Sequence, residues 1–149
     1  MALTARDVAE YFLTRVDAES GDSLSNLKLQ KLVYYAQGYH LALFGKPLFN
    51  ERIEAWEHGP VIPDLYRIYE QNKSQSIPPP DNFDPEKFDT ETRELLEEVF
   101  EVYGQFSASK LRNIAHAEKP WSDAYSVRPF APIEQKSMEQ YFKNLLVDA

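Results

Sequence analysis

Residues 29–66 read LQKLVYYAQGYHLALFGKPLFNERIEAWEHGPVIPDLY and join a helical pattern to a sharp turn. Apolar side chains recur here at steps of three and four residues, which predicts an amphipathic helix over residues 27–44 with Gly45 as its stop. This helix has more tyrosine rings than one buried stripe requires. Some rings are therefore expected on its flanking faces, against another helix or a partner; the rings are those of Tyr34, Tyr35 and Tyr39.

The turn that follows is centred on Gly59-Pro60, with Trp56 and His58 just before it. A residue before proline favours extended or turn geometry, and glycine lets another group approach the backbone closely. Side chains alternate over residues 52–57, which predicts a short strand or an extended segment. We expect Trp56 to be a wedge between helices or an interface anchor, because its indole N–H needs a hydrogen-bond partner.

Capping residues and apolar periodicity predict further helices along the chain. All the predicted helices together span residues 5–17, 27–44, 63–71, 90–104, 107–117 and 132 onward, with a single helical turn at 121–125. The last helix is expected to bury a stripe formed by Met138, Tyr141, Phe142, Leu145 and Leu146. The segment KSQSIPPPDNFDP at 73–85 predicts an exposed, proline-rich loop. The predicted fold is mainly α, a single compact helical domain over residues 1–149 with about six helices and one short β-strand pair.

The composition restricts the class of protein. A chain of 149 residues with 43% hydrophobic residues has the size and apolar content of one packed domain. A formal net charge of -8 without a dense basic stripe argues against nucleic-acid binding and suits a basic protein partner. The chain has no cysteine, which excludes disulfides and thiolate sites. The sequence carries no export signal and no apolar stretch of about 20 residues, so we expect a soluble, cytoplasmic protein without a membrane partner.

Histidine is the residue type most able to support chemistry in this chain, at His40, His58 and His116. Their spacing matches no metal-binding motif, so we expect neither a metal nor a cofactor. His116 lies at the end of a predicted helix, where the helix dipole favours it as a cationic cap. The segments around His58 and from His116 to Trp121 have similar content and are expected to pack together. Serine nucleophile elbows and phosphate-binding glycine loops are absent, so the sequence does not predict an enzyme.

These motifs resemble those of the Panacea domain family, which is also described as a phage-associated, SocA-like antitoxin family. The resemblance is carried by residues 29–37, 45–49 and 53–61, and it resumes at 111–121. Its most specific part is the Trp-x-His-Gly-Pro-Val block. Ala115 departs from the pattern, because many relatives are expected to have threonine or serine before the histidine, so any hydroxyl contact there is missing.

The resemblance implies an antitoxin of a bacterial or prophage toxin–antitoxin pair, which neutralises a cognate protein toxin by binding it. Delivery of the toxin to a protease is a further mode that the resemblance leaves open. The motif or partner-binding residues that it implies are Lys31, Tyr34, Tyr35, Trp56, His58, Gly59, Pro60, Tyr66, His116 and Trp121. Toxin specificity is expected in exposed parts, namely the loop at 73–84 and the flanking helix faces.

Two other functions stay open on the sequence. A small hydrolase or ligand-binding protein would use His58 and His116, with Glu57 or Glu118 beside them. An autoregulator would bind DNA, which the net charge of -8 opposes. Each aromatic residue of the motif is more often a core residue than an interface anchor, and the sequence does not separate the two roles.

Overall fold

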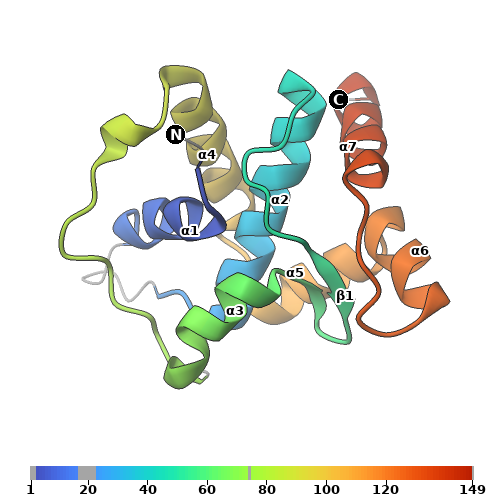
Figure 1. Cartoon of the computed structure of the whole chain (residues 1–149), viewed down its shortest axis with the longest axis horizontal. Coiled ribbons are helices and arrows are strands. Elements are labelled where there is room, and N and C mark those ends of the chain that lie inside the picture. Colours follow the sequence, from blue (N-terminus) through green and yellow to red (C-terminus); the bar gives the residue numbers. More distant parts are fainter. Residues whose placement is uncertain (1–2, 17–22, 74, 149) are drawn as a thin grey trace.

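A central helix, α2 (Asn26–Phe44), runs through the molecule and the other helices surround it (Figure 1). The computed structural model describes residues 3–16, 23–73 and 75–148. The other helices are α1 (Ala5–Thr14), α3 (Pro63–Tyr69), α4 (Thr90–Tyr103), α5 (Ala108–His116), α6 (Lys119–Val127) and α7 (Gln135–Asp148), with 3-10 turns at Glu70–Asn72 and Pro85–Lys87. The predicted compact, mainly α fold with one strand pair is confirmed.

Local sequence signals explain where these helices begin and end. The Thr4 side chain accepts a hydrogen bond from the Asp7 backbone, and Asp7 returns one to Thr4, which is the capping box that the sequence predicts. The Ser25 side chain caps α2, which ends at Gly45 in the left-handed conformation, with φ of 70°. Ile62 precedes α3 without a side-chain cap, as expected from its apolar side chain.

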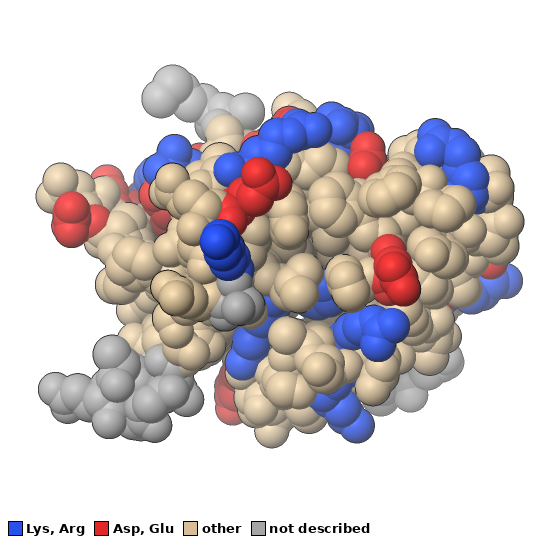
Figure 2. Space-filling view, turned by 90° about the horizontal axis from the view of Figure 1, so that it is seen from below, with Lys and Arg blue, Asp and Glu red and all other residues tan. Residues whose placement is uncertain are grey.

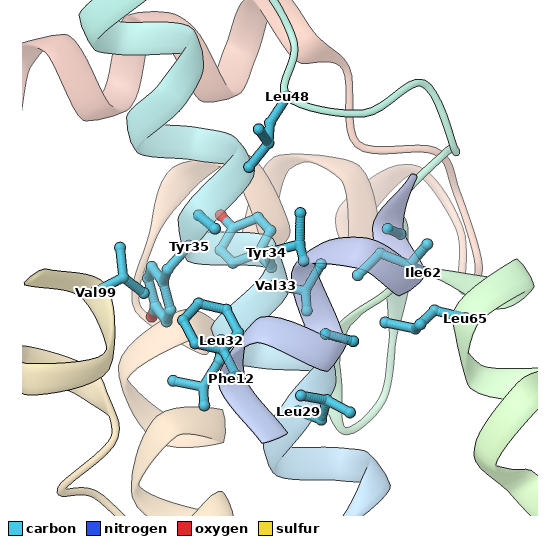
Figure 3. Packing of buried hydrophobic residues seen from close by; sticks show 14 of the residues in the cluster. Phe12, Leu29, Leu32, Val33, Tyr34, Tyr35, Leu48, Ile62, Leu65 and Val99 are labelled. Carbon is cyan, nitrogen blue, oxygen red and sulfur yellow. The ribbon is translucent and has the colours of Figure 1, made fainter. Parts of the chain in front are cut away.

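The middle of the central helix is buried on all sides, so its predicted amphipathic character is wrong there. Every residue from Leu29 to Gly38 is buried, because α1, α4, α5 and α7 all contact α2. Figure 3 shows side chains of α2 meeting Phe12 of α1 and Val99 of α4. Tyrosine rings on the flanking faces of α2 therefore meet other helices, which is one of the two outcomes that the sequence allowed.

Polar side chains of α2 fix the segments that follow it in the chain. The Gln37 carboxamide accepts a hydrogen bond from Leu48 N at 2.7 Å and donates one to Phe49 O at 2.8 Å. The Gln30 carboxamide accepts from Ile62 N at 2.9 Å. These bonds satisfy buried polar groups and set the position of the turn relative to the helix.

The turn is a β-hairpin of β1 (Glu54–Trp56) and β2 (Gly59–Val61), paired antiparallel. A distant segment extends it, because Ala55 N donates to Ala131 O and Ile133 N donates to Ile53 O, both at 2.8 Å. This pairing explains why the last helix begins at Gln135 and not at Pro132, which forms a β-bridge with Glu54.

Three further predictions need correction. The predicted single turn at 121–125 is the full helix α6, from Lys119 to Val127. The first helix ends at Thr14, and position 17 lies outside the described residues. The loop at 73–85 is mostly exposed, as predicted. Ile77 is the correction, because its side chain is buried and its N–H donates a hydrogen bond to Leu24 O at 2.9 Å, which attaches the loop to the core.

Candidate functional site

The two tryptophan-containing segments pack against each other, as the sequence predicts. The Trp121 indole N–H donates a hydrogen bond to Trp56 O at 2.8 Å. The His116 ring stacks on Trp121 with a centroid distance of 3.8 Å, and the Glu57 backbone hydrogen-bonds the same imidazole. The end of α5, the start of α6 and the hairpin therefore form one unit.

Positive groups surround His116. Burial is the largest cause that lowers its pKa below the usual value, and the charges of Arg112, Lys31 and His58 lower it further. The imidazole is therefore neutral at pH 7. Its place at the end of α5 is confirmed, and burial and these charges disfavour the cationic form that the expected cap needs.

Gly59 brings the hairpin bend close to a buried lysine. Its φ of 113° lies in the region that favours glycine, and a Cβ there would be 3.0 Å from Lys31 Cε. Lys31 is 1% exposed, and its ammonium has no hydrogen-bond partner within residues 3–16, 23–73 and 75–148. Burial, and then the charge of Arg112, lower the pKa of Lys31 to about 7. Pro60 beside the bend is buried, while His58 is exposed.

Tyr34 and Tyr35 are core residues and not surface anchors, because both are fully buried. Tyr35 stacks on Tyr103 at 4.0 Å and donates a hydrogen bond to Glu118 Oε1 at 3.0 Å. Burial of Glu118 outweighs the hydrogen bonds from tyrosine hydroxyls and raises its pKa to about 7. Trp121 is also buried, at 8% exposure. Partner contact by these side chains would require the core to open.

Trp56 and Tyr66 do reach the surface. The two half-buried rings lie 5.0 Å apart, and Phe130, at 54% exposure, meets Trp56 edge-on at 5.4 Å. The Trp56 indole N–H donates to Glu54 Oε1 at 3.0 Å, which satisfies it without a partner protein. We call Trp56, Tyr66 and Phe130 the aromatic patch. The sequence motif did not include Phe130, since only the pairing of residues 130–133 with β1 brings it there.

The structure also has an apolar groove that the sequence did not predict. The groove has a volume of about 250 Å³ and lies between α2, α4 and α7; its lining is Tyr39, Leu43, Leu95, Glu98, Val99, Val102, Tyr103 and Leu146. Three of these side chains are large, apolar and 40–50% exposed, namely Leu43, Val102 and Leu146. The prediction that Leu146 is buried is wrong, whereas Met138 and Phe142 of the same stripe are buried. The one signal of this groove in the sequence was the wide apolar face of α4. Packing against a single neighbouring helix does not require so wide a face.

The outer face of α4 connects the groove to the proline-rich loop. Glu98 lines the groove and also lines a larger cleft, of about 920 Å³, between α1, α4 and the loop. Pro80, Asp81, Phe83 and Pro85 are the residues of the loop that line this cleft. Glu94 and Glu98 are exposed, so acidic groups border the apolar groove on this side.

The described residues include no group of three or more His, Asp or Glu side chains placed to hold a metal ion. None of the helices described is both long enough and apolar enough to cross a membrane. His58 and His116 are within electrostatic range of each other, but His116 is packed on Trp121.

Comparison with known proteins supports the resemblance. The family model described as "Antitoxin SocA-like, Panacea domain" matches residues 29–122. The chain is also similar to Antitoxin SocA of Caulobacter vibrioides (strain NA1000 / CB15N), with 34% identity over 139 residues, covering 80% of this chain and 69% of that protein. No solved structure matches the chain. The matched range contains the hairpin, α4 and α5, and it ends before α7.

Proposed function

We propose that this chain, which belongs to the Antitoxin SocA-like, Panacea domain family, is an antitoxin that neutralises a protein toxin by binding it directly. The supporting observation is the apolar groove between α2, α4 and α7. Large apolar side chains that converge on one exposed groove are typical of protein interaction sites. The antitoxin acts without catalysis, in the cytoplasm, and its partner is the cognate toxin.

The groove favours an amphipathic helix of the toxin as its occupant. Leu43, Val102 and Leu146 come from three helices and offer apolar contacts to one side of such a helix. Exposed Glu94 and Glu98 beside the groove favour basic residues on the flank of the bound helix. The chain's net charge of -8 speeds association with a basic partner in the same way.

The proline-rich loop is placed to add toxin specificity. Its residues line the larger cleft, which shares Glu94 and Glu98 with the acidic face of α4. A toxin seated in the groove would reach the loop along this face. Most residues of the loop are exposed and can change without disturbing the core, apart from Ile77 and Phe83, which makes the loop suitable for distinguishing toxins.

The aromatic patch is a second candidate contact surface, because Phe130 is held exposed at a positive φ of 66°. Backbone strain at an exposed aromatic residue is often retained for function. Trp56→Ala is the variant that tests this surface. Loss of protection in a folded Trp56→Ala protein would place the toxin on the aromatic patch instead of the groove.

Co-expression with the toxin encoded by the neighbouring reading frame tests the groove. We expect the wild-type chain to restore growth, and Val102→Asn or Leu43→Asn to weaken protection, because each places a polar group at the centre of an apolar contact. The expected loss of affinity is roughly tenfold or more, about 1.4 kcal/mol. Both positions are 50% exposed in the free protein, so the variants should remain folded.

Val127→Asn is the matched control. Val127 is also a valine near the end of a helix, is 78% exposed and lies outside the groove. The Val127→Asn variant should protect cells from the toxin as well as the wild type does. Equal protection by Val102→Asn, Leu43→Asn and Val127→Asn would rule out the groove as the docking site.

The amount of toxin in the cell distinguishes direct binding from delivery to a protease. Direct binding predicts an unchanged toxin level during protection. A toxin level that falls with antitoxin expression, and recovers when a protease is removed, would establish delivery instead.

A further inference from the structure

Three buried nitrogen atoms near the hairpin bend have no hydrogen-bond partner among the residues that the structure describes. They are Lys31 Nζ on α2, Arg112 Nε on α5 and His116 Nε2 at the end of α5. Buried polar groups are nearly always paired, so three orphans in one region need an explanation. We call Lys31, Arg112 and His116 the cationic recess.

The three side chains come from elements that contact one another. The helix α2 contacts both β2 and α5, and α5 contacts β2. The pKa of Lys31 responds to the charge of Arg112, and the pKa of His116 responds to Arg112, Lys31 and His58. The groups are therefore near enough to repel each other, with His58 exposed at the edge.

Lys31 and Arg112 lack a carboxylate partner in the part of the chain that the structure describes. Burial and Arg112 are the causes that act on the pKa of Lys31, and an acidic side chain is not among them. Among the described residues, no ion pair includes Lys31 or Arg112. An unpaired buried cation is costly, and the remaining polar neighbours do not offset the cost.

The surface of the molecule is consistent with an opening here. The hairpin and α5 lie at the lower end of the molecule in Figure 1. Figure 2 shows that end from below, with a hollow near the middle and Lys and Arg side chains beside it. Local positive charge attracts anions to this face, although the chain has a net charge of -8.

We propose that the cationic recess binds an oxyanion, a carboxylate or phosphate group that accepts hydrogen bonds from Lys31 and Arg112. Gly59 contributes by having no Cβ, which would otherwise lie 3.4 Å from Lys31 Nζ and hinder approach to the ammonium. The oxyanion can be free in solution or belong to a side chain of a protein partner. The site is independent of the apolar groove, which shares none of these residues.

Thermal unfolding of the purified full-length chain tests the site with inorganic phosphate and with acetate, each compared with chloride at equal ionic strength. We expect one of the two oxyanions at about 20 mM to raise the melting temperature by about 4 °C, as for a ligand of roughly millimolar affinity. A larger shift with phosphate assigns the site to phosphate groups. A larger shift with acetate assigns it to carboxylates, such as an acidic side chain of a partner.

Lys31→Met is the decisive variant, because methionine keeps most of the length of the side chain and removes its charge. This variant should lose the oxyanion-dependent shift, and in chloride it should melt at or above the wild-type temperature, since a buried unpaired cation has been removed. A lysine that only stabilises the fold would instead give a lower melting temperature in chloride.

Lys110→Met is the control for charge, because Lys110 is exposed on the same helix as Arg112. It should keep the full shift. The proposal is overturned if neither oxyanion changes the melting temperature of the wild type. It is equally overturned if the shift persists in Lys31→Met, because the ion would then bind elsewhere.

Discussion

At the scale of single residues, burial decides what the motif residues do. Tyr35 and Glu118 form a buried hydrogen-bonded pair, so neither side chain is a surface anchor. The sequence could nominate Tyr35 as an aromatic of the motif but not assign it to the core, because the ring is covered by Tyr103 and Phe142, which lie far along the chain. Trp56 is also an aromatic residue of the motif, yet its side chain is only half-buried.

Glu118 gives the fold a pH dependence that can be measured. Its pKa is raised from 4.5 to about 7, so the folded protein holds a proton that the unfolded chain releases between these values. This contribution to stability is fully present below pH 4.5 and is lost as the pH rises through 7. Glu118→Gln cannot lose this proton, and it should be more stable than the wild type at pH 8 by about 3 kcal/mol.

Urea unfolding of both proteins at pH 5 and pH 8 measures the effect of Glu118. The two stabilities should converge towards pH 5 and separate at pH 8. A constant difference at both pH values would mean that the Glu118 carboxyl is ionised throughout this range in the folded protein.

At the scale of elements, the helices were predictable where their signals are local. Thr4 with Asp7, Ser25 and Gly45 act within a few residues, and the structure places the helix ends where these residues predict. The hairpin's third partner was not predictable, because the pairing of Ala55 with Ala131 joins segments far apart in the sequence. That pairing displaced the start of the last helix and brought Phe130 to Trp56.

The hairpin depends on glycine at its bend. Gly59→Ala would combine an unfavourable φ of 113° with a Cβ 3.0 Å from Lys31 Cε. We expect a loss of about 1–3 kcal/mol in the free energy of unfolding, measured by urea denaturation. Gly45→Ala is a useful comparison, since its φ of 70° is strained but its Cβ would meet nothing closer than 3.9 Å. Equal losses in the two variants would show that the contact with Lys31 adds nothing.

At the scale of the whole molecule, the chain has a buried central helix and distinct surfaces around it. The family motif lies largely in the core and in the hairpin unit, so it specifies the scaffold more than the docking surface. The apolar groove escaped prediction because its exposed residues belong to helices that also bury apolar faces. Val102 and Leu146 look like core positions until the packing of α2, α4 and α7 is known.

Direct titration of the purified chain with its purified toxin, by calorimetry in the absence of any protease or nucleotide, tests the central claim most directly. We expect a saturable complex that Val102→Asn weakens roughly tenfold and Val127→Asn leaves unchanged. This expectation is contradicted if the two proteins give no complex, or if both valine variants bind as tightly as the wild type.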